Sequence, residues 1–232
     1  MENKRWWLIP TIMCGVGAVV VVTIMLLLNA NNIEPFAVDI TVRDFFYSIR
    51  GEKGGFVYWV FRILTEFGDI IGIAIMAVLL IVYTRFDYRV VLLLVGAGLT
   101  FLVNKGFKEI FDRVRPIEEM RWQYESSTSF PSGHSANSSF LFSFLCYMTY
   151  RSNLKDVFKK VLYVVCPIMI IIVMSSRMVL GVHYFSDVCA GACVGLMMAG
   201  LLSILYEVCV KYNFFQKPLY DIIMEKRQAK SE

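Results

Sequence analysis

"WLIPTIMCGVGAVVVVTIMLLL", residues 7–28, decides what kind of fold this chain can have. The stretch carries no charged residue, and a bilayer core of about 30 Å takes about 20 apolar helical residues to cross. Lys4 and Arg5 stand just before it. A secretory signal peptide would begin in the same way, but its apolar core runs to only about 7–15 residues. We therefore interpret the stretch as a retained first membrane helix.

The rest of the chain continues this apolar character. Hydrophobic residues make up 57% of the 232 residues and charged residues only 18%, which is more apolar than a soluble domain. Further membrane-spanning stretches are indicated at residues 57–83, 90–103, 135–150, 161–174 and 188–206. Several fall short of 20 apolar residues, so neighbouring helices must shelter their ends. The sequence predicts an all-α polytopic membrane protein with six transmembrane helices in one bundle and one domain over residues 1–232.

The segment "FAVDITVRDFFYSIR", residues 36–50, follows the first predicted span and is too charged to be a second one. Its apolar residues recur at helical spacing, which favours an amphipathic helix lying on the outer face of the membrane. A simple ordered loop is the alternative interpretation.

Lys and Arg in the loops predict the orientation in the membrane. With six spans, both termini share one side with the loops at 85–89 and 151–160, and this side holds more than half of the 23 basic residues. We therefore expect the termini in the cytoplasm and the loops at 30–56, 105–134 and 175–187 outside. The basic run "EKRQAK", residues 225–230, suits a cytoplasmic end near anionic lipid.

Cysteine spacing argues against a metal or disulfide framework. Nearly all of the six cysteines fall inside apolar stretches, and none has a spacing such as C-x-x-C. Buried small side chains are the simpler interpretation.

Three polar motifs interrupt the apolar chain, and all three lie in the loops assigned to the outer side. In "KEIFDRVRP", residues 108–116, Lys108 and Arg115 are seven residues apart and would point the same way on a helix. Alone they would be interfacial cations at a helix end. Gathered around one pocket with Arg177, they would neutralise a bound phosphate.

The second motif, "PSGH" at 131–134, predicts the start of a helix. Ser132 can cap the helix and Gly133 lets the backbone approach a ligand, while the free N–H groups and the helix dipole attract an anion. A plain capped helix explains Ser132 but does not explain His134, which is one of only two histidines in the chain.

The third motif, "SRMVLGVHYFSD" at 176–187, places His183 four residues before Asp187. On one helical face the carboxylate could accept one imidazole N–H and leave the other nitrogen free to attack a substrate. The alternative is a hydrogen bond that only stabilises the start of the last helix.

Together, K-x6-RP, PSGH and SR-x5-H-x3-D resemble the signature of the type 2 phosphatidic acid phosphatase family. Its relatives include bacterial phosphatidylglycerophosphate phosphatases, undecaprenyl diphosphate phosphatases and the soluble vanadium-dependent haloperoxidases. All three motifs are complete and in order between Lys108 and Asp187. The resemblance implies that His183 attacks phosphorus to form a phosphohistidine, that Asp187 orients it, and that His134 protonates the leaving group and activates water.

The resemblance also implies a set of groups that hold the phosphoryl oxygens. These are Lys108, Arg115, Ser132, Gly133 and Arg177. No metal or other cofactor is expected, because the cations and a helix N-terminus supply the positive field. The expected partners are the bilayer and a lipid phosphate substrate, not a nucleic acid.

The motifs leave the substrate and some alternatives open. Undecaprenyl diphosphate and phosphatidylglycerophosphate are the leading substrates, followed by phosphatidic acid, and the oligomeric state is not predicted. Membrane helices argue against a haloperoxidase-like enzyme that uses vanadate. A non-catalytic phosphate-lipid binding or transport protein would not need the His183–Asp187 pair facing His134. A lipid phosphotransferase, which passes phosphate to an acceptor other than water, stays open.

Overall fold

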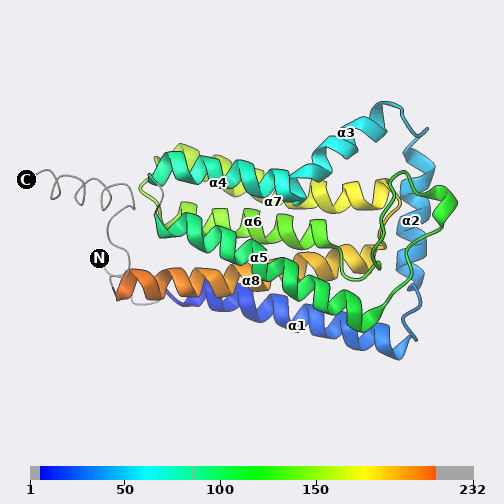
Figure 1. Ribbon diagram of the computed structural model, residues 1–232, viewed down its shortest axis with the longest axis horizontal. Helices are drawn as coiled ribbons and strands as arrows, with labels where there is room; N and C mark the ends of the chain where they lie inside the picture. Colours follow the sequence, from blue (N-terminus) through cyan, green and yellow to red (C-terminus); the bar gives the residue numbers. More distant parts are fainter. Residues whose placement is uncertain (1–5, 86, 213–232) are drawn as a thin grey trace, which may run out of the picture.

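The computed structural model describes residues 6–85 and 87–212, and this part of the chain is entirely helical apart from its connections. Figure 1 shows most of the helices running side by side in one bundle. The bundle contains α1 (Leu8–Ala30), α4 (Ile70–Thr84), α5 (Tyr88–Phe111), α6 (Gly133–Arg151), α7 (Asp156–Val179) and α8 (Phe185–Lys211). The shorter elements are α2 (Ala37–Ile49), α3 (Phe56–Leu64) and two 3-10 turns, η1 (Thr65–Gly68) and η2 (Glu118–Met120). The all-α prediction is confirmed.

Among the described residues, four helices are long and apolar enough to cross a membrane. These are α1, α5, α7 and α8, and α3–η1 with α4 would add a fifth crossing as a bent pair. The helix α6 is not among them, because small polar residues fill its first turns. It packs against α5, α7 and α8 and buries much of its length, so neighbouring helices shelter its polar start. The six-span count stays a prediction.

The second predicted span, residues 57–83, was wrong in one respect, because it is not one continuous helix. It bends by 56° between η1 and α4. Asp69 begins the new helix by accepting a hydrogen bond of 2.8 Å from its neighbour's backbone N–H. A Cβ atom on Gly68 would come within 2.6 Å of the His134 carbonyl oxygen, so only glycine allows the break to lie against α6.

Small residues bring α8 close to its two neighbours, α1 and α6. A Cβ on Gly195 would lie 2.1 Å from the Ala136 carbonyl oxygen, and one on Gly200 would lie 2.6 Å from the Pro10 carbonyl oxygen. Without a hydrophobic driving force between helices in lipid, such close backbone approach gives the packing contacts that hold helices together. This packing fixes the start of α8 beside the start of α6.

The amphipathic segment predicted at 36–50 is the helix α2, which lies across one end of the bundle in Figure 1. Two buried charged residues attach it there, Asp39 in its first turn and Arg50 at its end. Arg50 donates hydrogen bonds to the carbonyl oxygens of Val179 and Met120. The first residues of α1 and the last of α8 lie at the opposite end of the bundle. The basic run at 225–230 falls outside the described residues.

Candidate active site

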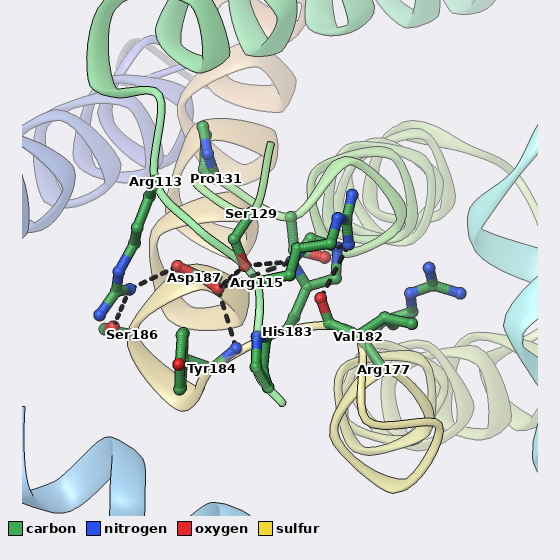
Figure 2. A network of polar contacts seen from close by, with 12 residues as sticks. Arg113, Arg115, Ser129, Pro131, Arg177, Val182, His183, Tyr184, Ser186 and Asp187 are labelled. Atoms are coloured by element: carbon green, nitrogen blue, oxygen red, sulfur yellow. Dashed lines mark hydrogen bonds and ion pairs between the residues drawn. The ribbon is translucent and has the colours of Figure 1, made fainter. Parts of the chain in front are cut away.

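All three polar motifs meet at the end of the bundle that α2 covers. The first comes from the end of α5 and the loop after it, the second from the start of α6, and the third from the connection between α7 and α8. Figure 2 shows Arg113, Arg115 and Ser129 of the loop after α5 lying around His183 and Asp187. The helical packing therefore brings together residues that lie far apart in the sequence.

His183 lies just before α8 and is only 4% exposed. Its Nε2 is 3.2 Å from Arg115 Nη1, and its Nδ1 faces Asp187 Oδ2 at 3.6 Å. A guanidinium can only donate hydrogen bonds, so Nε2 must accept and Nδ1 must carry the proton. The ring is thus held in the tautomer whose Nε2 lone pair is turned toward the cations of the site.

Asp187 and His183 are adjacent, as the sequence predicts, but their separation of 3.6 Å is longer than a hydrogen bond. Asp187 Oδ2 instead accepts hydrogen bonds from Ser129 Oγ at 2.5 Å and from the Tyr184 backbone N–H at 2.8 Å. Ser129 Oγ is also 3.5 Å from His183 Nδ1. The Ser129 hydroxyl therefore contacts both the carboxylate and the imidazole, a role that no sequence motif indicated.

The environment of His183 favours its neutral form. Burial lowers the pKa of His183 well below 6.5, and the positive charges of Arg115, Arg177 and Lys108 lower this pKa further. A neutral imidazole keeps the nitrogen lone pair that a nucleophile needs.

Lys108, Arg115 and Arg177 form a cationic cluster, and backbone carbonyls fix two of them. Lys108 donates to the Thr128 carbonyl oxygen. Arg115 donates to the Val182 carbonyl oxygen at 2.7 Å, and burial lowers its pKa to about 10, so it stays charged at neutral pH. All three cations are close enough to His183 to act on it electrostatically. Lys108 and Arg115 do not share a helix as the spacing predicted, because α5 ends at Phe111 and Arg115 lies in the loop after it. Their role in holding phosphate stays a prediction.

Glu125 is an acidic member of the site that the sequence motifs did not reveal. Its carboxylate pairs with Arg177 and lies 3.9 Å from Arg115 Nη2. Arg177 is fully buried and also donates to Thr65 Oγ1 at 3.0 Å. A single carboxylate in the loop after α5 had no spacing signal that could have linked it to residues of α7.

The start of α6 contributes the second histidine. The Ser132 side chain caps the helix through the Ser135 backbone N–H, and the Ser132 backbone N–H donates to the Asp187 carbonyl oxygen at 3.0 Å. A Cβ on Gly133 would make only an ordinary contact of 3.4 Å with Asn104. Packing within the chain therefore does not require a glycine at this position. A ligand that approaches the backbone closely would require one. The roles of Ser132 and Gly133 in phosphate binding stay predictions.

His134 faces Asp69, which caps α4. Its Nε2 lies 3.6 Å from Asp69 Oδ2, and it is within electrostatic range of Arg177 and His183. Asp69 was predicted only as part of a membrane-spanning stretch. The break between η1 and α4 turns it toward the site instead.

A second polar network lies behind Asp187. Arg113, which is 2% exposed, donates to Asp187 Oδ1 at 2.5 Å and to Asp39 Oδ2 at 2.9 Å (Figure 2 shows the Asp187 contact). Sequence reasoning assigned no role to either Arg113 or Asp39. Within the described residues, no group of three His, Cys, Asp or Glu side chains has the arrangement of a metal site.

Comparison with known proteins gives a consistent set of relatives. A sequence profile of the PAP2 superfamily matches residues 89–211. Phosphatidylglycerophosphatase B of Bacillus subtilis (strain 168) is 36% identical over 108 residues, which are 46% of this chain and 53% of that protein. The chain thus spans about half the length of the curated relative it matches.

Two solved structures are similar over most of their length. One is the crystal structure described as the first transmembrane PAP2 type phosphatidylglycerolphosphate phosphatase, from Bacillus subtilis. It has a TM-score of 0.71 and 28% identity, covering 83% of this chain and 96% of that chain. The crystal structure of Aquifex aeolicus LpxE has a TM-score of 0.60 and 21% identity, covering 75% of this chain and 99% of that one, and it supports the fold alone.

Proposed function

The chain belongs to the PAP2 superfamily, and we propose that it is a multi-pass membrane enzyme that hydrolyses a phosphate group from a membrane lipid. The observation that carries the proposal is the setting of His183. Its Nε2 accepts from Arg115 at 3.2 Å, while Asp187 and Ser129 face its Nδ1. A neutral, oriented imidazole beside three cations is the arrangement that attack on a phosphoryl group needs.

In the first step, His183 Nε2 attacks phosphorus and the bond between phosphorus and the lipid oxygen breaks. His134 gives its proton to the departing oxygen, and Asp187 stabilises the positive charge that develops on the His183 ring. The result is a phosphohistidine and a dephosphorylated lipid.

In the second step, a water molecule attacks phosphorus and loses its proton to His134. The bond between phosphorus and Nε2 breaks, which releases inorganic phosphate and restores both histidines. Lys108, Arg115 and Arg177 stabilise the charge that spreads over the phosphoryl oxygens, together with the Ser132 and Gly133 groups at the start of α6. We infer that no metal or other cofactor takes part.

The position of the site supports a lipid substrate. It lies at one end of a bundle of apolar helices, beneath the amphipathic helix α2, where a lipid headgroup would meet it. The names of the matching Bacillus subtilis protein and of the matching Bacillus subtilis structure make phosphatidylglycerophosphate the leading substrate. Undecaprenyl diphosphate is the second candidate; there the terminal phosphoryl group is transferred to His183 from a lipid monophosphate instead of an alkoxide. Phosphatidic acid follows.

We propose that α6 is a sixth crossing, and that the site faces the extracytoplasmic side. An even number of crossings agrees with the start of α1 and the end of α8 lying at the same end of the bundle. Neighbouring helices cover α6, so it need not be apolar over its whole length.

The test is phosphate release by the purified protein in detergent, beside the His183→Ala variant. Phosphatidylglycerophosphate, undecaprenyl diphosphate and phosphatidic acid are supplied in parallel, each with excess EDTA. We expect release that survives EDTA and falls at least a thousandfold in the variant, and an acid-labile phosphoprotein in rapid quench experiments. Labelled phosphate that passes to a second lipid instead of water would favour a phosphotransferase, and no release by folded protein would overturn the proposal.

A further inference from the structure

The helix α2 reaches the site through one fully buried carboxylate. Asp39 Oδ2 accepts hydrogen bonds from Arg113 at 2.9 Å and from the Ser186 hydroxyl at 2.8 Å, and Oδ1 accepts from the Ser186 backbone N–H at 2.7 Å. Oδ2 also accepts from the Phe36 backbone N–H at 3.0 Å. Four donors satisfy this carboxylate, and none of its side chain is exposed.

Arg113 connects Asp39 to the carboxylate that faces the nucleophile. Its Nη2 contacts Asp39, and its Nη1 contacts both Ser186 at 2.8 Å and Asp187 at 2.5 Å. The guanidinium also lies over the ring of Tyr184, 4.7 Å from its centroid. The fork geometry of arginine holds two carboxylates at fixed positions at once.

The charges of this network explain why both carboxylates are needed. Arg113 alone would fix Asp187 in place but would also neutralise it. Asp39 supplies a second negative charge, so that the group of Asp39, Arg113 and Asp187 keeps a net charge of −1 beside His183. This charge is what favours the cationic ring that forms when His183 attacks.

We propose that Asp39 and Arg113 are positioning residues for the nucleophile, acting through Asp187. The inference rests on the proposed function. It also gives α2 a function, because Asp39 connects this amphipathic helix to the reaction centre through Arg113 and Asp187.

The competing interpretation is that the network only anchors α2 to the bundle. Arg50 provides the matched control, because it is a second buried charge on the same helix. Its guanidinium contacts the Val179 and Met120 carbonyl oxygens and the rings of Tyr47 and Trp122. Arg50→Gln therefore weakens the attachment of α2 without touching the Asp187 network.

The experiment measures kcat and KM for phosphatidylglycerophosphate release in Asp39→Asn, Arg113→Gln, the double variant and Arg50→Gln. We expect both single variants to lose about 10–100-fold in kcat, as residues that support a reactive group typically do, with KM changed less than threefold. We expect Arg50→Gln to keep kcat within threefold. A wild-type kcat in folded Asp39→Asn, or an equal loss in Arg50→Gln, would overturn the inference.

A pH profile separates an electrostatic role from a structural one. Asp39→Asn removes a negative charge and should move the acid limb of kcat/KM to lower pH, whereas Arg113→Gln removes a positive charge and should move it to higher pH. The double variant should return close to the wild-type limb. The other groups that face His183 are common to all the variants: Asp187 from α8, Arg115 from the loop after α5, Lys108 from α5, Arg177 from α7 and His134 from α6.

Each single variant removes one member of a buried ion pair and leaves the other charge without its partner, which can prevent folding. The double variant removes both charges, so it tests the inference even if the single variants do not fold. With both charges gone, kcat should still fall about tenfold, because Asp187 loses its charged partner. A wild-type kcat there would overturn the inference.

Failure of the proposed function is recognised separately, as an absence of phosphate release by the wild type. In that event the thermal unfolding midpoint of each variant is measured from pH 5 to 8 and compared with that of the same variant carrying His183→Gln. The difference reports the titration of His183 without any substrate, and it should shift to lower pH in Asp39→Asn and to higher pH in Arg113→Gln. Shifts in the same direction, or none, would overturn the inference by this route too.

Discussion

At the scale of single residues, His183 carries a pH dependence that can be tested without a substrate. Its pKa in the folded protein lies well below 6.5, chiefly through burial, whereas an unfolded chain has the ordinary value. The unfolded chain therefore binds more protons below pH 6.5, and stability is lost as the pH falls through that value.

We predict that the wild type loses stability relative to His183→Gln between pH 6.5 and 5, by up to about 1.4 kcal/mol per pH unit. Above pH 7 the difference between the two proteins should be constant. Denaturant unfolding in detergent across this range measures it. Parallel pH profiles for the two proteins would show that His183 is not held neutral.

Glu125 makes a second prediction at this scale. Its carboxylate pairs with Arg177 and lies near Arg115, so it would compete with a phosphate anion for the same guanidinium groups. The carboxylate is partly exposed, and such a pair is worth about 1 kcal/mol after screening. Glu125→Gln should therefore tighten inhibition by inorganic phosphate about fivefold.

The matched control for this prediction is Glu119→Gln. Glu119 is an exposed acid in the same loop, so its replacement should leave the inhibition constant within twofold. The measurement is the inhibition of lipid dephosphorylation by added phosphate. Weaker inhibition in Glu125→Gln would mean instead that Glu125 holds the arginines in their binding geometry.

At the scale of helices, periodicity and hydropathy predicted α1, α2, α5, α7 and α8 close to their observed positions. An apolar or amphipathic pattern is a local property of the sequence and does not depend on which helices pack together. The break between η1 and α4 was missed, since residues 57–83 are apolar enough for one long helix and the bend depends on Gly68 lying against α6. The motif residues were predicted because their spacings resemble a family signature, and their roles stay predictions. Asp39, Arg113, Glu125 and Ser129 were not, because only the packing of α2 and the loop after α5 brings them to the site.

The contact between α6 and α8 gives the prediction for this scale. A Cβ on Gly195 would meet the Ala136 backbone oxygen at 2.1 Å, which forces the two helices apart. Gly195→Ala should destabilise the protein by about 1–3 kcal/mol, the cost of overpacking. It should also lower kcat, because α6 and α8 carry His134 and Asp187.

Gly98→Ala in α5 is the control, since nothing lies within 4 Å of its Cβ position. The higher helix propensity of alanine should leave that variant as stable as the wild type or slightly more so. Thermal unfolding in detergent compares the two. Equal midpoints would show that the close approach of α6 and α8 does not limit stability.

At the scale of the whole molecule, the bundle has two chemically different ends. The site, α2 and the loop after α5 lie at one end, and the start of α1, the end of α8 and the loop between α6 and α7 lie at the other. The loops and the helix ends at the second end, together with the terminal segments of the sequence, hold more than half of its basic residues. Lys and Arg are retained on the cytoplasmic side during insertion, so the charge distribution favours a site that faces outward.

Cysteine labelling in intact cells tests this orientation. Glu52→Cys places a thiol in the exposed connection between α2 and α3 at the site end, and Asn153→Cys places one in the exposed connection between α6 and α7 at the other end. The wild type, whose own six cysteines lie within helices, sets the background. A membrane-impermeant maleimide should label position 52 in intact cells and position 153 only after permeabilisation, because a charged reagent cannot cross the bilayer. The reverse pattern would place the site in the cytoplasm. Labelling of both positions in intact cells would put residues 52 and 153 on the same side and would contradict an even total number of crossings, counted from α1 to α8.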